Sequence, residues 1–491
     1  MATIIRNGKI VTAEGSFIGD LRMEAGKIAA LGSGVGVAAG DEVVDASGCL
    51  LFPGGVDVHT HLDMPIGPDS ATCDDFYTGH RAAAFGGTTT HVDFANQTRG
   101  ESLRLTLDKW EARAAGKAVI DYGFHVTILD PTPAVLAEMS QLRAWGVNTI
   151  KLFLAYKARG MMLDNEQFFV LCRKAAQLGL LPLVHAEMGE VIDLLEREAI
   201  AAGRTAPRWH ATVRPAIAEA EATNRAIALA RMAGSALYVV HVTCRGSLEA
   251  IRRAQAEGAP IYGETCPQYL FFTADDLARP DFEGAKFVCS PPLRTKEDHA
   301  ALWEGLADGT LQALSTDHAP FRFADQKERG RERFDHIPNG VPAIEHRLTL
   351  LWHFGVNRGT LTPQQFVALT ATNPARLFGL APRKGTLTPG ADADILLWDP
   401  NAPWTISADT HQMAVDYDIW EGVSGRGRPL KVWRRGQLLV DGERWLGQAG
   451  SGERVARGDF SRPTEREASH RFYPRNGAGG FAQILDSNGL G

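Results

Sequence analysis

The sequence predicts an α/β protein in which a TIM-like (β/α)8 barrel is combined with a small β-sandwich domain built from both termini. Three observations predict this fold class. The chain has 491 residues, which is too long for a single compact core. Both ends are rich in short segments typical of β-strands. Between them, eight apolar, β-branched runs alternate with helical patterns, as expected for parallel strands joined by crossovers.

The β-rich ends are recognised by turn signals between alternating apolar runs. Near the start of the chain, Asn7-Gly8 separates two such runs, which predicts a β-hairpin. The same pattern recurs in residues 393–399 and 430–445, with turns expected at Arg435-Gly436 and Asp441-Gly442. Two similar ends around a different middle indicate one small domain assembled from both.

The middle of the chain supplies the barrel. Helical patterns occur between several of the runs, for example in residues 102–116 and 168–179. The eight predicted strands are residues 56–59, 90–95, 122–128, 149–154, 181–187, 236–243, 260–266 and 313–318.

We therefore expect three parts in the chain. The β-sandwich domain comprises residues 1–53 and 385–460, and the catalytic barrel comprises residues 54–384. Residues 461–491 are rich in glycine, serine and charge. This tail is expected to be disordered or to form an arm on a neighbouring subunit.

The composition is that of a globular protein, with 44% hydrophobic and 22% charged residues. A net charge of -7 disfavours nucleic acid or an anionic membrane as a partner. Six scattered cysteines without a C-x-x-C motif form neither a zinc ribbon nor a dense disulfide framework. The sequence shows no signal-peptide core and no apolar run long enough to span a bilayer. A reduced, cytoplasmic setting is expected.

Polar residues mark the carboxyl ends of several predicted strands, where such barrels place their active sites. In "GGVDVHTHLDMP" (54–65), His59 and His61 are two apart and point to the same side of a strand. His185, His241 and Asp317 lie at the ends of three other strands, and Lys151 lies in a fourth. One such histidine alone is usually structural. Four histidines with an aspartate predict a site for zinc or another divalent first-row metal.

Lys151 interrupts an apolar run, where a bare ammonium is costly. It could extend to solvent, or pair with an acid. Beside four histidines a third option exists, because burial and nearby cations depress the pKa of a lysine. A neutral amine can capture carbon dioxide as a carbamate. Such a carbamate would bridge two metals roughly 3.5–4 Å apart.

Several motifs together closely resemble the dihydropyrimidinase and D-hydantoinase family of cyclic amidohydrolases, which are metal-dependent. The resemblance covers about residues 2–460 and is carried by "GGVDVHTHLDMP", "KLFLAYKARGMM", "VHAEMGE", "YVVHVTC", "SPPLRTKEDHAALW", "STDHAPF" and "IPNGVPAIEHRL". Three departures are Met188 after "HAE", Ala319 after "TDH", and details of the "KARGMM" loop. They put the tuning of the site and the substituent preference in doubt, but not the metal ligands.

The resemblance implies two zinc ions per subunit. His59, His61 and Asp317 would bind the more buried ion, and His185 and His241 the other. Carbamylated Lys151 and a hydroxide would bridge both ions.

The implied reaction is the opening of a cyclic amide in a small-molecule cyclic ureide, giving an N-carbamoyl amino acid. Asp317 would act as general base and then as general acid. Tyr156, on the loop after the fourth strand, is either a packed tyrosine or, as the resemblance implies, a donor to the oxyanion. Ser290 and Asn339 resemble the family's substrate anchors, although their proline and glycine neighbours alone indicate only turns.

Alternatives remain open at this stage. The same fold also carries allantoinases, dihydroorotases and non-enzymatic assembly proteins. Asp63 stands where a dihydroorotase typically has an arginine for the substrate carboxylate, so an anionic ring is disfavoured whether Asp63 faces the substrate or turns away. The family is often tetrameric, so a homo-oligomer, dimer or tetramer, is expected. Candidate apolar contacts for the ring substituent are Met64, Ile66, Phe153 and Met162.

Overall fold

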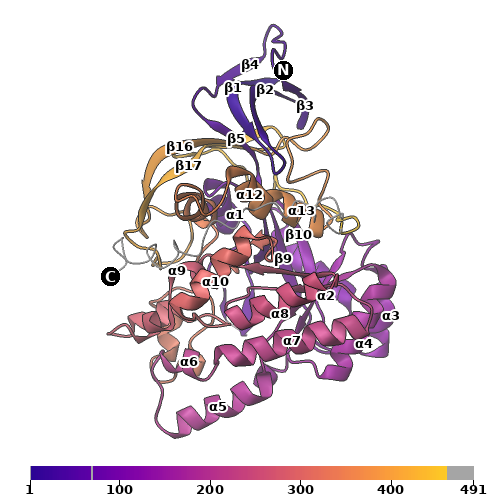
Figure 1. Ribbon diagram of the computed structural model, residues 1–491, viewed down its shortest axis with the longest axis vertical. Coiled ribbons are helices and arrows are strands. Elements are labelled where there is room, and N and C mark those ends of the chain that lie inside the picture. The colour runs from indigo at the N-terminus through magenta and orange to yellow at the C-terminus, as the bar shows by residue number, and fades with distance from the viewer. Residues whose placement is uncertain (1, 68–69, 462–491) are drawn as a thin grey trace.

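The computed structural model describes residues 2–67 and 70–461 of the chain. In Figure 1 the N-terminal strands form a β-sheet unit at the top, and a larger unit below it contains strands surrounded by helices. Residues 462–491, nearly all of the predicted tail, lie outside the described residues. Within the described ranges, no helix is long and apolar enough to cross a membrane.

Eight parallel strands form the barrel sheet, in the order β15-β14-β13-β12-β11-β10-β9-β6. Each overlaps one of the eight predicted runs, so the predicted barrel is confirmed. A parallel bridge between Thr60 and His318 places the chain after the last strand against the first. The strands are β6 (Gly55–Thr60), β9 (Thr88–Asn96), β10 (Asp121–Thr127), β11 (Thr149–Phe153), β12 (Leu181–His185), β13 (Leu237–Val239), β14 (Ile261–Thr265) and β15 (Ala313–Leu314).

The barrel strands are buried on both faces. Every residue in them is buried except Asn96. Parallel strands covered by helices on one side and packed into a barrel on the other lose the alternation of polar and apolar residues. This is why the sequence shows them as continuous apolar runs, and why a polar side chain within them is informative.

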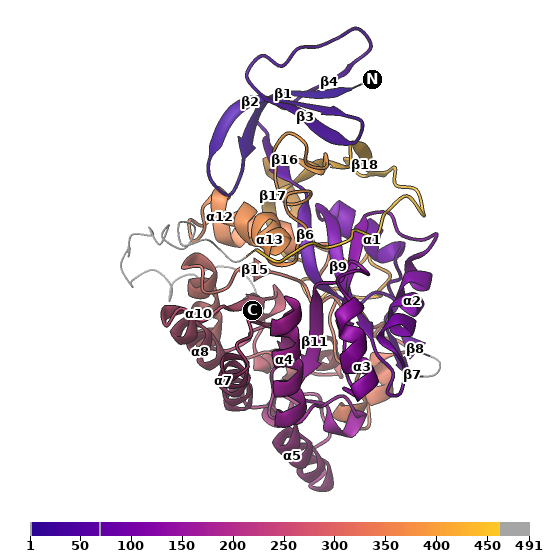
Figure 2. The same cartoon turned by 90° about the vertical axis from the view of Figure 1, so that its right-hand side faces the viewer.

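Helices surround the barrel, as Figure 2 shows for α3, α4 and α7 outside β6, β9 and β11. Helices α2 and α4 confirm the two helices predicted from the sequence. Asp164 caps the start of α4 together with Gln167, and Gly179 ends it at a φ of 65°. The α-helices are α1 (Thr78–Phe85), α2 (Leu103–Ala114), α3 (Pro133–Glu138), α4 (Asn165–Leu178), α5 (Gly189–Ala201), α6 (Trp209–Thr212), α7 (Ala216–Met232), α8 (Arg245–Ala256), α9 (Gln268–Phe271), α10 (Lys296–Ala307), α11 (Arg347–Leu351), α12 (Pro363–Val367) and α13 (Asn373–Leu377).

Shorter elements lie in the loops between these helices and strands. Strands β7 (Pro65–Gly67) and β8 (Ser70–Ala71) pair after β6. Short 3-10 turns are η1 (Met139–Gln141), η2 (Lys157–Arg159), η3 (Ala274–Ala278), η4 (Glu283–Phe287), η5 (Lys327–Gly330) and η6 (Phe334–His336), and η7 (Trp352–Val356) and η8 (Ala368–Thr372) are π-helical.

The second sheet joins the two ends of the chain, as predicted. Its order is β19-β18-β17-β16-β5-β1-β2-β3, with β4 paired to β1. Strand β5, from the N-terminal part, pairs with β16, from the C-terminal part. The strands are β1 (Thr3–Val11), β2 (Ser16–Glu24), β3 (Lys27–Gly32), β4 (Glu42–Asp45), β5 (Leu50–Pro53), β16 (Ile395–Thr405), β17 (Ser424–Arg434), β18 (Gln437–Asp441) and β19 (Arg444–Trp445).

The hairpin predicted at Asn7-Gly8 is wrong. The two runs around it form one strand, β1, and the pair lies at a bulge in its pairing with β2. Asn7 takes the left-handed conformation, with a φ of 60°, and its N–H donates to Asp20. Asparagine and glycine favour such a bulge as well as a turn, so the dipeptide does not distinguish the two. The turn predicted at Arg435-Gly436 is confirmed and joins β17 to β18.

The chain after β19 returns to the barrel. The N–H of Tyr122 donates to the carbonyl of Glu453 at 2.9 Å, and the N–H of Val455 donates to the carbonyl of Tyr122 at 2.7 Å. The buried guanidinium of Arg457 donates to Thr149 Oγ1 at 2.8 Å and to the carbonyl of Phe124. Residues 453–457 therefore lie against the barrel. The domain boundaries expected from the sequence remain a proposal.

Candidate active site

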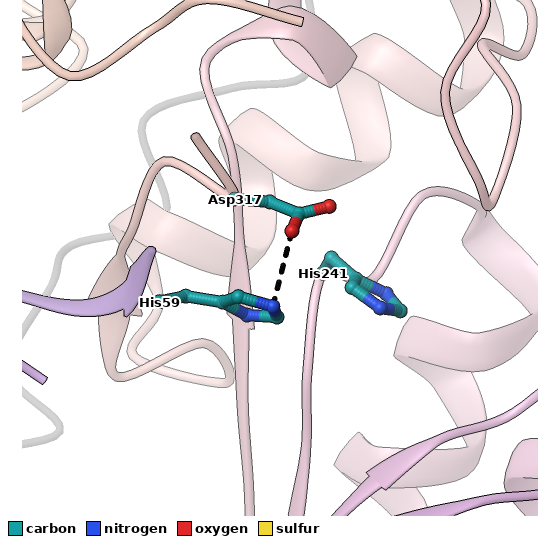
Figure 3. A group of neighbouring side chains, drawn as sticks. All are labelled: His59, His241 and Asp317. Atoms are coloured by element: carbon teal, nitrogen blue, oxygen red, sulfur yellow. Dashed lines mark ion pairs between the residues drawn. The ribbon is translucent and has the colours of Figure 1, made fainter. Parts of the chain in front are cut away.

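One large cavity, of about 1070 Å³, opens at the carboxyl ends of the barrel strands. The six residues predicted to bind metal all line it: His59, His61, Lys151, His185, His241 and Asp317. Figure 3 shows three of them, His59, His241 and Asp317, with their side chains gathered from separate segments of the barrel. One ligand atom from each of these three lies within 4.8 Å of the others. The six side chains thus converge on one rim of the barrel, as the sequence predicts.

The strands position these side chains in different ways. His59 and His185 lie at or next to the ends of β6 and β12, and Lys151 lies inside β11. His241 and Asp317 follow β13 and β15 in the left-handed region, with φ of 37° and 49°. Such a backbone costs about 1–3 kcal/mol for a residue other than glycine and is found mainly at functional sites.

Asp317 joins the two histidines of β6. Its Oδ1 lies 3.1 Å from His59 Nε2 and 3.0 Å from His61 Nε2. Behind His59, Nδ1 lies 2.5 Å from the carboxylate of Glu264, which holds the ring proton on that nitrogen. The lone pair of His59 Nε2 is thereby turned toward the carboxylate of Asp317. Two acceptors facing each other require positive charge between them.

A second pair of histidines also has a carboxylate behind one of its rings. His185 Nδ1 lies 2.9 Å from His241 Nε2, and His185 Nε2 lies 2.7 Å from the carboxylate of Glu187. His185 Nε2–H therefore donates to Glu187, and Nδ1 is left with its lone pair free to bind a cation. His241 Nδ1 is buried and has no hydrogen-bond partner among the described residues.

The electrostatics of the site also favour cations. Burial alone lowers the pKa of His59, but the charges of Asp317 and Glu264 outweigh it and raise the pKa to about 9. Imidazoles whose outer nitrogens donate to carboxylates, arranged with one aspartate, are the usual ligand set of zinc and similar metals. The residues present therefore fit a divalent metal site.

Lys151 is fully enclosed. Its Nζ lies 4.8 Å from the centre of the Phe94 ring and 5.2 Å from that of Phe153. Among the described residues no carboxylate lies within salt-bridge distance of it, and its exposed fraction is 1%, so neither an ion pair nor an extended lysine explains it. Burial lowers its pKa to about 8, against the opposing charges of Asp317 and Glu264. Near neutral pH a larger share of its amine is therefore neutral than in a solvated lysine.

Tyr156 lies on the loop after β11, with a φ of 63°. Its ring centre is 5.0 Å from that of His185 and 5.9 Å from that of Phe153. Burial and the charge of Glu187 raise the pKa of its phenol. The hydroxyl therefore stays protonated and available as a donor at the edge of the metal-ligand group.

Ser290 and Asn339 meet on the wall of the cavity. Asn339 Nδ2 donates to Ser290 Oγ at 3.0 Å, and His210 Nε2 lies 3.3 Å from the same oxygen. The loops that carry them are joined by Lys327, whose buried ammonium donates to the carbonyls of Val288, Pro338 and Gly340 at 2.9, 2.8 and 2.7 Å.

Sequence reasoning missed Glu187, Glu264, Lys327 and His210. For Glu187 and Glu264 the sequence contains a pattern that could have indicated them. Glu187 is two residues after His185, on the same face of an extended segment. Glu264 is a carboxylate inside a predicted buried strand. Lys327 and His210 have no such pattern, because they are far in sequence from the groups they contact.

Three other histidines of the barrel contact neighbouring protein groups. His125 contacts Thr149 and the carbonyl of Val58, and His91 contacts His80 and Thr60. His318 points away from the cavity and contacts Asp74 at 3.1 Å.

The substituent contacts need one correction. Met64, Ile66 and Phe153 line the cavity, but Met161 does so in place of Met162. The Met162 sulfur instead lies close to Gly189, at the start of α5. The direction of neighbouring side chains in an irregular loop has no fixed period, so the sequence did not separate the two.

Asp63 is turned toward two cations. Its carboxylate lies 3.2 Å from Arg113 and 3.8 Å from Lys117, and it is not among the described residues that line the cavity. Of the two orientations considered for Asp63, the structure shows the one that faces away from a substrate.

A further group of His346, His411 and Asp418 lies apart from the cavity. His346 Nε2 and His411 Nδ1 lie 2.7 and 3.1 Å from the same oxygen of Asp418, and His411 Nε2 lies 3.0 Å from the carbonyl of Val415. Burial lowers the pKa of both histidines, but Asp418 outweighs it and raises them. Both nitrogens of His411 thus face acceptors, whereas His241 Nδ1 in the cavity has no hydrogen-bond partner among the described residues.

Comparisons with known proteins agree with this site. The chain matches the amidohydrolase family over residues 50–439. It is 49% identical to a D-hydantoinase of Streptomyces coelicolor, over 92% of this chain and 97% of that protein. It is 47% identical to a D-hydantoinase of Geobacillus stearothermophilus, over 94% and 97%.

A solved structure shows the same architecture. The crystal structure of dihydropyrimidinase from Brevibacillus agri superposes with a TM-score of 0.93 at 47% identity, over 94% of this chain and all of that one (100%). Family match, relatives and fold agree, and the chain therefore belongs to the dihydropyrimidinase and D-hydantoinase family of cyclic amidohydrolases.

Proposed function

We propose that this enzyme opens the cyclic amide bond of dihydropyrimidines and 5-substituted hydantoins to give N-carbamoyl amino acids. The observation that carries the proposal is the meeting of six metal-type ligands with Tyr156, Ser290 and Asn339 around one cavity. The names of the similar proteins, D-hydantoinase and dihydropyrimidinase, support the same substrate class.

The proposed cofactor is a pair of zinc ions. His59, His61 and Asp317 would hold one, His185 and His241 the other, and carbamylated Lys151 would join both. When bound, such ions lower the pKa of water and polarise the amide carbonyl. The lone pair of His59 that faces Asp317, and the approach of His185 Nδ1 to His241 Nε2, support this assignment.

The chain's own residues would handle the proton and the substrate. Burial raises the pKa of Asp317, but His59 and His61 outweigh it and lower that pKa well below its usual range. Asp317 is therefore ionised and available to take a proton from the attacking water and to pass it to the leaving nitrogen. Ser290 and Asn339 would hold the ring amide. Phe94 and Phe153 exclude water around Lys151.

Replacing Tyr156 by phenylalanine is expected to lower kcat by about two to three orders of magnitude, because it removes a hydrogen-bond donor to the developing oxyanion. The ring, and its packing on His185 and Phe153, is retained. Steady-state kinetics on a neutral hydantoin measure the effect. A kcat close to that of the unmodified enzyme would show that Tyr156 only packs.

A substrate panel tests the function as a whole. Dihydrouracil, 5-substituted hydantoins, dihydroorotate and allantoin are incubated with the purified enzyme, and ring-opened products are separated by chromatography. Opening of dihydrouracil or hydantoins is expected. Turnover confined to allantoin or dihydroorotate would assign a rival activity. Asp63 pairs with Arg113, so it is not expected to repel the carboxylate of dihydroorotate.

A cytoplasmic location and a homo-oligomeric state remain part of this proposal. The cysteines are all free thiols in the structure, which supports a reduced setting. The oligomeric state is measured by light scattering on the purified protein.

A further inference from the structure

Apart from Lys151, which belongs to the metal-ligand group, Arg159 is the one arginine or lysine on the cavity wall for which the described residues supply no acidic partner. Lys109, which also lines the cavity, lies 2.5 Å from the carboxylate of Glu101. Arg113 lines the cavity as well and is paired with Asp63 at 3.2 Å. The exposed Arg159 guanidinium instead lies over the ring of Tyr156, 5.4 Å from its centre. Its charge is available to a ligand.

The loop that carries Arg159 is held in place from two sides. The N–H of Ala158 donates to the carboxylate of Asp193, on α5, at 3.0 Å. Arg99 Nε donates to the carbonyl of Gly160 at 2.7 Å. Gly160 itself needs the left-handed conformation, with a φ of 69°. The backbone of Arg159 is therefore fixed before substrate binds, which reduces the entropy lost on binding.

Arg159 lines the same cavity as Ser290 and Asn339, the proposed substrate anchors. Its charge adds to burial in lowering the pKa of His210, which in turn lies 3.3 Å from Ser290 Oγ. Apolar side chains of Met64, Ile66 and Phe153 line the same cavity. Asp317 is the single carboxylate among the described lining residues, and it belongs to the metal-ligand group. A substituent on the ring thus meets apolar side chains and one exposed cation, Arg159, that has no acidic partner among the described residues.

We propose that Arg159 binds the carboxylate of an acidic ring substituent, so that the enzyme favours hydantoins or dihydropyrimidines whose side group ends in a carboxylate. A planar guanidinium can donate two parallel hydrogen bonds to a carboxylate, while a methylene stem packs on the apolar wall. This assignment rests on the proposed function and names the substrate class within it.

The test compares carboxylates with matched amides. Hydantoin-5-acetate and hydantoin-5-propionate are assayed beside their carboxamides, which have the same shape and no charge. The ratio of kcat/KM for the acid over the amide is expected to be about tenfold or more. It should fall to about one in Arg159→Met, and an aminoalkyl hydantoin should become the better substrate in Arg159→Glu.

Lys157→Met is the matched control. Lys157 is exposed, belongs to the same short turn and carries the same charge, but it is not among the described lining residues. Its removal should leave the ratio unchanged. A ratio at or below one in the unmodified enzyme, an unchanged ratio in Arg159→Met, or an equal fall in Lys157→Met would overturn the inference. If the unmodified enzyme opens none of the rings, acid, amide or dihydrouracil, it is the proposed function that fails.

Discussion

Replacing Lys151 by alanine is expected to lower kcat/KM by at least about three orders of magnitude, because it removes the group proposed to join two metals. The charge of Lys151 reaches His59, His61 and His241, so it lies among both groups of ligands. No other lysine is among the described residues that line the inner part of the cavity beside these histidines. Steady-state kinetics on dihydrouracil and metal analysis of the same preparation measure the effect.

The variant should still fold, because a buried ammonium without an acidic partner does not stabilise the core. Thermal unfolding checks this. A small carboxylic acid in the buffer is expected to restore part of the activity by taking the place of a carbamate, and the recovered activity should saturate with acid concentration. Full activity of Lys151→Ala without any additive would contradict the proposed bridge.

The purified enzyme is expected to contain about two divalent ions per chain, and their removal by a chelator should abolish activity. Added zinc should restore it. Within the site, His241→Ala is expected to lower the metal content by about one ion, because it leaves His185 as the single histidine of its pair. Elemental analysis and activity are measured on the same samples.

His411→Gln is the matched control for the metal experiment. His411 also belongs to a group of two histidines and an aspartate, but that group lies away from the cavity and its nitrogens face acceptors. The metal content of the His411→Gln variant should equal that of the unmodified protein. One ion or none in an active, unchelated preparation would contradict a two-metal site. A lower metal content in His411→Gln would show that an ion binds at His346, His411 and Asp418.

The architecture and the central residues could be predicted because they depend on local pattern. Buried barrel strands appear as apolar runs, and their carboxyl ends share one rim, so His59, His185 and Asp317 could be brought together without coordinates. Asn7-Gly8 shows the limit of such patterns. Its backbone conformation suits a turn or a bulge, and the pairing of β1 with β2 along both runs decides between them.

Groups that support the site were harder to predict because their partners are distant in sequence. Lys327 acts on carbonyls of residues 288, 338 and 340, and nothing in its own surroundings in the sequence indicates three acceptors. Arg159 was hard to predict for the opposite reason, because what matters is a missing partner. Its significance is that no carboxylate of the described residues lies within ion-pairing distance of its guanidinium, whereas Lys109 and Arg113 on the same wall are paired with Glu101 and Asp63.

The segment of residues 453–457 links the order of synthesis to the completion of the barrel. Arg457 fills a place between β10 and β11 with hydrogen bonds to Phe124 and Thr149, yet it follows every barrel strand and the strands of the second sheet in the chain. While the ribosome is still making these later strands, β10 and β11 lack this cover. The last contacts of the barrel therefore form only after the second sheet has been synthesised, and a chain stopped before residue 453 is expected to be less stable.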